Sequence, residues 1–214
     1  MRNSGVTTEV IIIKRINFKD QDKIVTLYTK EFGKVAVIAK GIRKLESKRK
    51  SHFELGNLLK IDLIESHKFY IAAQTEIIET HPKLKLSLER VNALYYVLEV
   101  FDGLIPEKDD NALLFKFLNK TINNLETIDE KKLTNFLNAY SLKVLRMSGF
   151  LNDPLEILHT KTNKEYYENI TNLINQTYEE ITNSPQEEYL AGEIFSLVKT
   201  YTEGILERKI KSLK

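Results

Sequence analysis

The order of its hydrophobic patterns constrains this 214-residue chain most strongly. Before residue 80, short apolar runs rich in β-branched residues are separated by turn signals, which is typical of β-strands. After Pro82, apolar residues recur at the spacing of amphipathic α-helices. The predicted strands are residues 9–14, 23–29, 35–39, 58–64 and 69–76. We therefore expect an α+β protein of two domains, with the strands first and the helices after them.

The five predicted strands are short and close together in the sequence. They are too few for a large sandwich, and an open sheet would leave unpaired edges, which a closed barrel removes. A five-stranded oligonucleotide-binding (OB) barrel fits this count. We expect residues 1–80 to form an OB-fold nucleic-acid-binding domain and residues 81–214 to form an all-α domain.

Helix boundaries follow from capping residues and helix breakers. Pro106 ends the first helical pattern, and Asp109 or Asp110 is placed to cap the second. Asp129 is placed to cap a third helix, and Gly149 to end it. The last helices are predicted around residues 163–182 and after a capping box at residues 184–187.

A basic loop follows the first predicted hairpin, and it is the clearest candidate for a binding site. Glu46 is the one acidic residue between residues 40 and 50. Lysine and arginine bind nucleic acid non-specifically through its phosphates. The predicted DNA-binding residues are Lys14, Arg15, Lys34, Lys40, Arg43, Lys44, Lys48, Arg49 and Lys50. The alternative to DNA binding is that these cations are only solvated surface. The loop lacks apolar periodicity, so we expect its cations to contribute little to stability.

Three aromatic residues of the predicted barrel could stack on nucleic-acid bases: Tyr28, Phe69 and Tyr70. Aromatic residues are favoured in strands in any case, so the alternative for each is a place in the core.

The charge distribution also favours a polyanionic partner for the first domain. Residues 1–85 carry 17 Lys/Arg and 10 Asp/Glu, whereas residues 86–214 carry 15 and 20. A high general lysine content is the alternative explanation of this imbalance.

Catalytic motifs are missing from the sequence. There is no cysteine, and the four histidines are scattered. Neither a glycine-rich phosphate loop nor a nucleophile-elbow motif occurs. We therefore predict no enzyme activity, no metal site and no cofactor. The sequence has neither a signal-peptide pattern nor a membrane-length apolar run, so we expect a cytoplasmic protein with no membrane association.

Residues 22–29, 32–34 and 39–43 are similar to the N-terminal signature of the RecO family of bacterial recombination mediators. The segments 148–150 and 210–213 resemble later motifs of the same family. The resemblance implies an OB barrel that binds single- and double-stranded DNA and anneals complementary strands. It also implies cooperation with a RecR-like protein and single-strand-binding protein, indirect assistance to RecA, and a nucleoid-associated location.

The sequence departs from the family pattern at two places. Many members hold zinc with four cysteines after the segment that corresponds to residues 148–150, and this chain has none, so no zinc site is carried over. Where some members place basic residues that dock the tail of single-strand-binding protein, this chain has Asn138 and Ala139 before Tyr140. Tail docking is therefore not carried over residue by residue.

Two functions remain at this point. The first is a DNA-binding recombination mediator. The second is a protein-interaction adaptor of a replication or repair complex, in which the helical domain binds partners and DNA contact is not essential.

Overall fold

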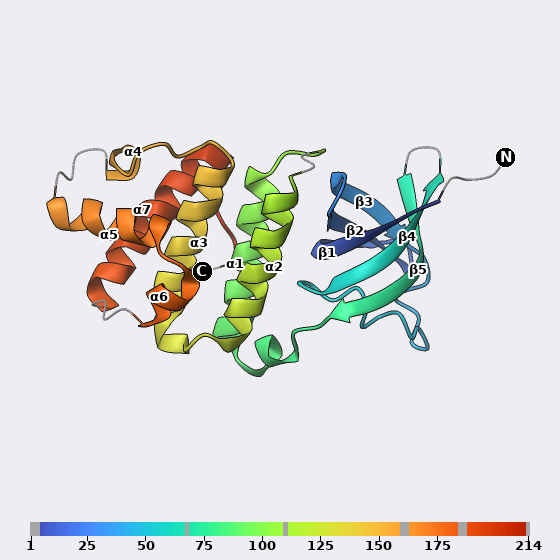
Figure 1. The fold of residues 1–214 in the computed structure, drawn as a ribbon. Helices are drawn as coiled ribbons and strands as arrows, with labels where there is room; N and C mark the ends of the chain where they lie inside the picture. The colour runs from blue at the N-terminus through green and yellow to red at the C-terminus, as the bar shows by residue number, and fades with distance from the viewer. Residues whose placement is uncertain (1–4, 67–68, 109–110, 159–162, 184–187, 213–214) are drawn as a thin grey trace. The chain divides into compact units, whose positions relative to one another are not determined.

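The structure is a computed structural model that describes residues 5–66, 69–108, 111–158, 163–183 and 188–212 (Figure 1). Five strands form a closed barrel in the order β1-β2-β3-β5-β4, which confirms the predicted fold class. Their bounds are β1 Gly5–Phe18, β2 Asp22–Thr29, β3 Gly33–Ala39, β4 Leu58–Ser66 and β5 Phe69–Glu79. Each predicted strand is present, and β1 extends well beyond its predicted length at both ends. His67 and Lys68, between β4 and β5, lie outside the described residues.

The barrel closes around a core of alternating apolar side chains. Neighbouring strands pair antiparallel except β3 and β5, which pair in parallel. On β2 the inward side chains are Val25 and Leu27, two residues apart, as the two-residue period of a strand requires. Val10 and Ile12 of β1 face them from the neighbouring strand.

A bulge interrupts β1 at Ile13. Ile12 pairs with Leu27, but Lys14 pairs with Thr26, so Ile13 is an extra residue on this strand. Because one residue is absorbed, the inward positions change from even to odd numbers at this point. Arg15 is consequently the partner of Val25, a core residue.

The segment between β3 and β4, residues 40–57, is a folded loop in which Gly41 has a φ of +68°. Successive backbone turns join Lys44 N to Gly41 O, Ser47 N to Lys44 O, and Lys50 N to Ser47 O. Ile42 and Phe53 are buried in the barrel core. The loop is therefore attached to the barrel near both of its ends.

The helical part contains η1 Pro82–Leu86, α1 Leu88–Leu104, α2 Ala112–Thr127, η2 Glu130–Lys132, α3 Leu133–Met147, α4 Leu155–Leu158, α5 Lys164–Asn175, α6 Tyr178–Asn183 and α7 Glu188–Leu206. The almost wholly buried α3 packs against α1, α5, α6 and α7. Among the described residues, no helix combines the length and the apolar character that crossing a membrane requires.

The helix ends agree only partly with the predictions. Gly149 ends α3 with a φ of +78°, and Phe150 N donates to Leu145 O, the hydrogen bond of a Schellman motif. Asp129 caps the short η2 rather than α3. At the start of α2, the Asn111 side chain accepts from the amides of residues 113 and 114.

Three other helix predictions have different outcomes. The predicted caps Asp109 and Asp110, and the capping box at residues 184–187, lie outside the described residues. The helix expected around residues 163–182 is present as α5 and α6, which are separated at Gln176 and Thr177.

The chain groups into two compact units: residues 1–82 with 106–122, and residues 83–105 with 123–214. Residues at the start of α2 thus belong with the barrel strands, a grouping that sequence order alone does not indicate. The domain boundary between residues 80 and 81 stays a prediction.

Candidate nucleic-acid interface

The register of β1 and β2 places three polar side chains at one end of the barrel interior. Asn17 pairs with Lys23, and Arg15 pairs with Val25. Since side chains two residues apart share a face, Arg15, Asn17 and Lys23 extend the inward side beyond Val25 and Leu27. The lining of the barrel therefore changes from apolar to cationic toward this end.

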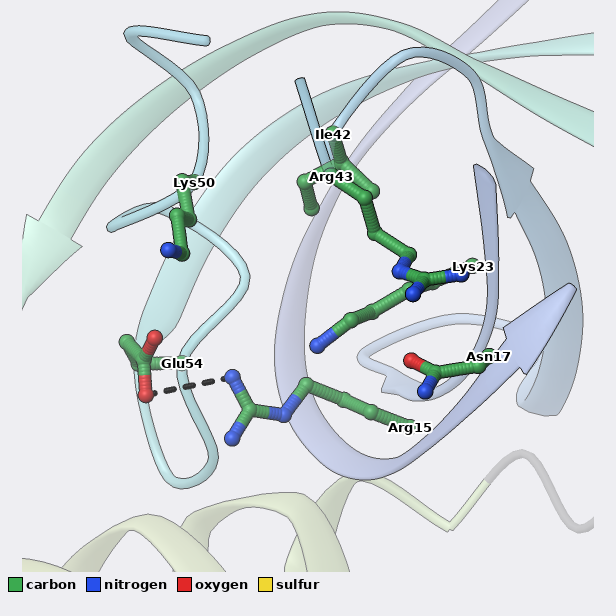
Figure 2. A pocket seen from close by; sticks show the side chains of 7 residues that line it. All are labelled: Arg15, Asn17, Lys23, Ile42, Arg43, Lys50 and Glu54. Atoms are coloured by element: carbon green, nitrogen blue, oxygen red, sulfur yellow. Dashed lines mark ion pairs between the residues drawn. The ribbon is translucent and has the colours of Figure 1, made fainter. Parts of the chain in front are cut away.

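These side chains and the loop enclose a pocket of about 220 Å³. Figure 2 shows its lining, which we call the cationic pocket: Arg15, Asn17, Lys23, Ile42, Arg43, Lys50 and Glu54. In this view the Lys23 ammonium lies between the guanidinium groups of Arg43 and Arg15. Four cationic side chains share the pocket with one carboxylate.

The position of Arg15 is fixed by the loop. Its Nη1 lies 3.1 Å from Glu54 Oε2 and donates to the carbonyl oxygen of Phe53 at 3.0 Å. Phe53 is itself buried in the barrel core. The guanidinium is therefore held at the pocket wall rather than free to move in solvent.

Lys23 has the most unusual electrostatic environment of the pocket. Partial burial and the positive charges of Arg15, Arg43 and Lys50 lower its pKa below the usual 10.5, against the opposing effect of Glu54. Within the described part of the chain, no hydrogen bond or ion pair joins the Lys23 or Lys50 ammonium to another residue. Their donors remain available to a ligand.

Arg43 is positioned by contacts with the turn between β1 and β2. Its amide donates to Gln21 O at 2.9 Å, and its Nη1 donates to Lys19 O at 3.1 Å. The amide of Gly41 donates to Asp22 Oδ1 at 2.8 Å. These hydrogen bonds join the loop to the β1–β2 turn, so the two sides of the pocket form one structure.

Arg49 corrects the expectation that the loop cations have little to pack against. Its guanidinium donates to the carbonyl oxygens of Ala73 at 2.6 Å, Ala72 at 3.4 Å and Lys40 at 3.1 Å. Because these bonds join the loop to β5, Arg49 has a structural role. A phosphate would have to compete with three carbonyl groups for its donors.

The other predicted cations separate into three groups. Arg15, Arg43 and Lys50 meet in the pocket. The side chains of Lys40, Lys44 and Lys48 are exposed on the same loop, outside the pocket.

Lys14 and Lys34 lie elsewhere. Lys14 is exposed and, as the neighbour of Arg15, points to the opposite side of β1. Lys34 is the second residue of β3, beside the β2–β3 turn. It lies six residues from Lys40, which is roughly 20 Å at the rise of a strand. The structure therefore does not bring Lys34 to the pocket.

The prediction that Tyr28 stacks on bases is wrong, because its side chain is 0% exposed. Its ring stacks on Phe115 with 6.3 Å between ring centroids, and its hydroxyl donates to Asn111 O at 3.4 Å. Tyr70 is partly buried against the barrel core, whereas Phe69 is 50% exposed. Phe69 has an accessible ring, and its stacking role stays a prediction.

Sequence reasoning missed Lys23 and Asn17 as pocket residues. The sequence pattern predicts Lys23 only as the first residue of a strand, and Asn17 follows the predicted end of the first strand. The hairpin of β1 and β2 could have paired them, but the bulge at Ile13 leaves no clear signal in the residue types.

Among the described residues, no group of three or more histidine, aspartate or glutamate side chains could hold a metal ion.

Comparison with known proteins gives two family matches. Residues 1–81 match the family model "Recombination protein O N terminal", and residues 86–153 match "Recombination protein O C terminal". The chain is similar to a "DNA repair protein RecO" of Roseiflexus sp. (strain RS-1), at 33% identity over 150 residues, which cover 70% of this chain and 52% of that protein.

Two further relatives carry the same printed name. The protein of Chlorobium phaeobacteroides (strain BS1) is 31% identical over 151 residues, which cover 67% of this chain and 55% of that protein. The protein of Thermoanaerobacter sp. (strain X514) is 24% identical over 221 residues, with 96% of this chain and 88% of that protein covered. The matches to the Roseiflexus and Chlorobium proteins thus span about half of each relative's length.

Proposed function

Since the chain belongs to the recombination protein O (RecO) family of DNA repair proteins, we propose that it binds DNA directly through the cationic end of its barrel. In this proposal it acts as a recombination mediator and does not catalyse bond chemistry. It binds single- and double-stranded DNA and anneals complementary strands.

One observation carries the proposal: Arg15, Lys23, Arg43 and Lys50 surround one pocket, with Glu54 as the one acidic residue of its lining. Phosphate contacts by lysine and arginine release counterions and supply most of the affinity in non-specific DNA binding. The exposed Lys40, Lys44 and Lys48 continue the positive surface along the loop.

Annealing follows from the same chemistry. Contacts with phosphates position a strand without reading its sequence, so the bases remain available for pairing. Cations that neutralise two backbones together reduce the repulsion between the strands. By family likeness we extend the proposal to cooperation with a RecR-like partner, exchange with single-strand-binding protein, indirect help to RecA, and a place at the bacterial nucleoid.

The adaptor alternative has a different observation in its favour. Met147, Phe150 and Leu155, around the end of α3, are between 38% and 53% exposed. The three are close in the sequence, and contiguous exposed apolar side chains are typical of surfaces that bind other proteins. In this alternative, removing pocket charges leaves the function of the protein unchanged.

Titration of a fluorescent single-stranded oligonucleotide separates the two. We expect the variant K23A/R43A/K50A to lose at least about tenfold in affinity at modest salt, and strand annealing to fall with it. The matched control K83A/K116A/K131A removes three exposed lysines outside the pocket and its loop. Equal affinities for the parent, the pocket variant and the control would overturn the proposal and favour the adaptor.

A further inference from the structure

Resting on the proposed DNA binding, we propose that the cationic pocket takes a terminal phosphate monoester, the phosphorylated end of a DNA strand. The exposed loop lysines then contact internal phosphates of the same strand. The pocket would thereby give the protein a preference for phosphorylated ends.

The size of the pocket suits a small anion. Its volume of about 220 Å³ lies below the range of roughly 300–1,000 Å³ that is usual for small-molecule sites. A phosphate group with part of its hydration shell fits this space.

The base of the pocket also suits a terminal group. Ile42, a lining residue, is 3% exposed and belongs to the barrel core, so packed side chains lie beneath this part of the lining. An internal phosphodiester carries a sugar on both sides of its phosphate. A terminal monoester carries one substituent and presents three acceptor oxygens. A pocket backed by the core suits the monoester.

The pocket carries an excess of positive charge. The ion pair of Arg15 with Glu54 offsets one positive charge, which leaves Lys23, Arg43 and Lys50 in excess. A phosphate monoester carries a charge of about −1.5 to −2 at pH 7, and an internal diester carries only one negative charge. Since Coulomb attraction grows with the charge of the ligand, this excess favours the monoester.

Lys23 lies among other cations. Partial burial, together with the repulsion of its ammonium by Arg15, Arg43 and Lys50, lowers its pKa. An anion bound among these groups relieves the repulsion. The arrangement is therefore suited to a strongly anionic ligand.

The test compares two single-stranded oligonucleotides of one sequence, with an internal fluorophore and either a 5′-phosphate or a 5′-hydroxyl. We expect the 5′-phosphorylated strand, or in a second pair the 3′-phosphorylated strand, to bind at least about fivefold more tightly. Inorganic phosphate at constant ionic strength should compete and remove the difference. A ratio of one for both ends, with DNA still bound, overturns this inference and leaves the proposed function intact.

The variants connect the preference to the pocket. K23A should bring the ratio of the two affinities to one. K50A, which should reduce this ratio, is included in case K23A folds poorly. K44A, outside the pocket, should weaken both strands equally and keep the ratio. A ratio that persists in folded K23A and K50A overturns the inference. If the parent protein binds neither strand, the proposed function is overturned together with the inference.

Discussion

The Nη1 of Arg49 donates to the carbonyl oxygen of Ala73 at 2.6 Å and so joins the basic loop to strand β5. A residue whose type and position suggest a phosphate contact is thus part of the barrel's own hydrogen bonding. The loop therefore contains cations that stabilise the fold and cations that are exposed to a ligand. Substituting the first kind should lower stability, and substituting the second kind should lower binding.

We expect Arg49→Ala to lower the free energy of unfolding by about 1–3 kcal/mol, because three carbonyl groups lose a charged donor. Lys48→Ala, at an exposed position in the same loop, should change it by less than about 0.5 kcal/mol. Urea denaturation of both variants gives the comparison. Equal stabilities would mean that the Arg49 hydrogen bonds contribute nothing measurable.

The salt dependence of DNA binding should report the number of phosphate contacts. For single strands, log K falls against log salt with a slope of about −0.7 per contact. The variant K23A/R43A/K50A should therefore reduce the magnitude of the slope by about two units relative to the parent. Anisotropy titrations at four or five salt concentrations measure it. An unchanged slope would place the DNA contacts outside the cationic pocket.

Substitutions of Tyr28 and Phe69 should have different effects, the first on stability and the second on DNA binding. Tyr28→Ala should cost about 3–5 kcal/mol of unfolding free energy, because it leaves a cavity in a fully buried site. Phe69→Ala should leave the fold intact and weaken single-stranded DNA binding by about 1–3 kcal/mol if its exposed ring stacks on a base. Thermal melts and oligonucleotide titrations of both variants are the measurements. Parental affinity of Phe69→Ala would assign that ring to the protein surface alone.

Lys23 should titrate below 10.5, because burial and the neighbouring cations lower its pKa. Between the folded pKa of Lys23 and 10.5, the unfolded chain then binds more protons than the folded chain. The contribution of Lys23 to the free energy of unfolding therefore increases as pH rises through this range. A bound anion favours the charged form and should move the pKa upward. NMR titration of the lysine side chains, with and without inorganic phosphate, tests both shifts; Lys23→Met identifies the signal.

Tyr201 and Glu156 should make the region after α3 sensitive to acid. The Tyr201 hydroxyl donates to Phe150 O at 2.7 Å and to Glu156 Oε2 at 2.8 Å. Burial, followed by Glu156, raises the Tyr201 pKa to about 12, and the hydrogen bond from Tyr201 lowers the Glu156 pKa below 4.5. Stability from the Glu156 shift is present above pH 4.5 and is lost as pH falls through the folded pKa.

Tyr201→Phe removes this hydroxyl. We expect its melting temperature to lie below that of the parent at neutral pH, with a difference that shrinks once Glu156 is protonated. Melting curves between pH 3 and pH 7 give the comparison. A difference that is constant over this range would assign the loss to the Phe150 carbonyl alone.

The strands of the barrel could be predicted because their pattern is local. Val25 and Leu27 lie in a short apolar, β-branched run, and Gly149 occupies the left-handed position that ends α3. Such signals depend on a few consecutive residues. The capping residue of α2 is harder to predict, because Asn111 and the two aspartates before it are all residue types that cap helices well.

The cationic pocket could be predicted only in part, because it depends on contacts between distant residues. The local density of positive charge predicts Arg43 and Lys50 as binding residues. Lys23 enters the pocket through its pairing with Asn17, and Arg49 leaves the binding set through its bonds to β5. Neither relationship is visible in the order of residue types.

The bulge at Ile13 has a consequence for comparing this chain with its relatives. Before Ile13 the core positions of β1 are Val10 and Ile12, and after it the inward positions are Arg15 and Asn17. A relative whose β1 runs without the extra residue would present the neighbour of its matching arginine to the pocket. The binding residues of this chain and its relatives must therefore be aligned separately before and after Ile13. One misplaced alignment gap would match an inward side chain with an outward one.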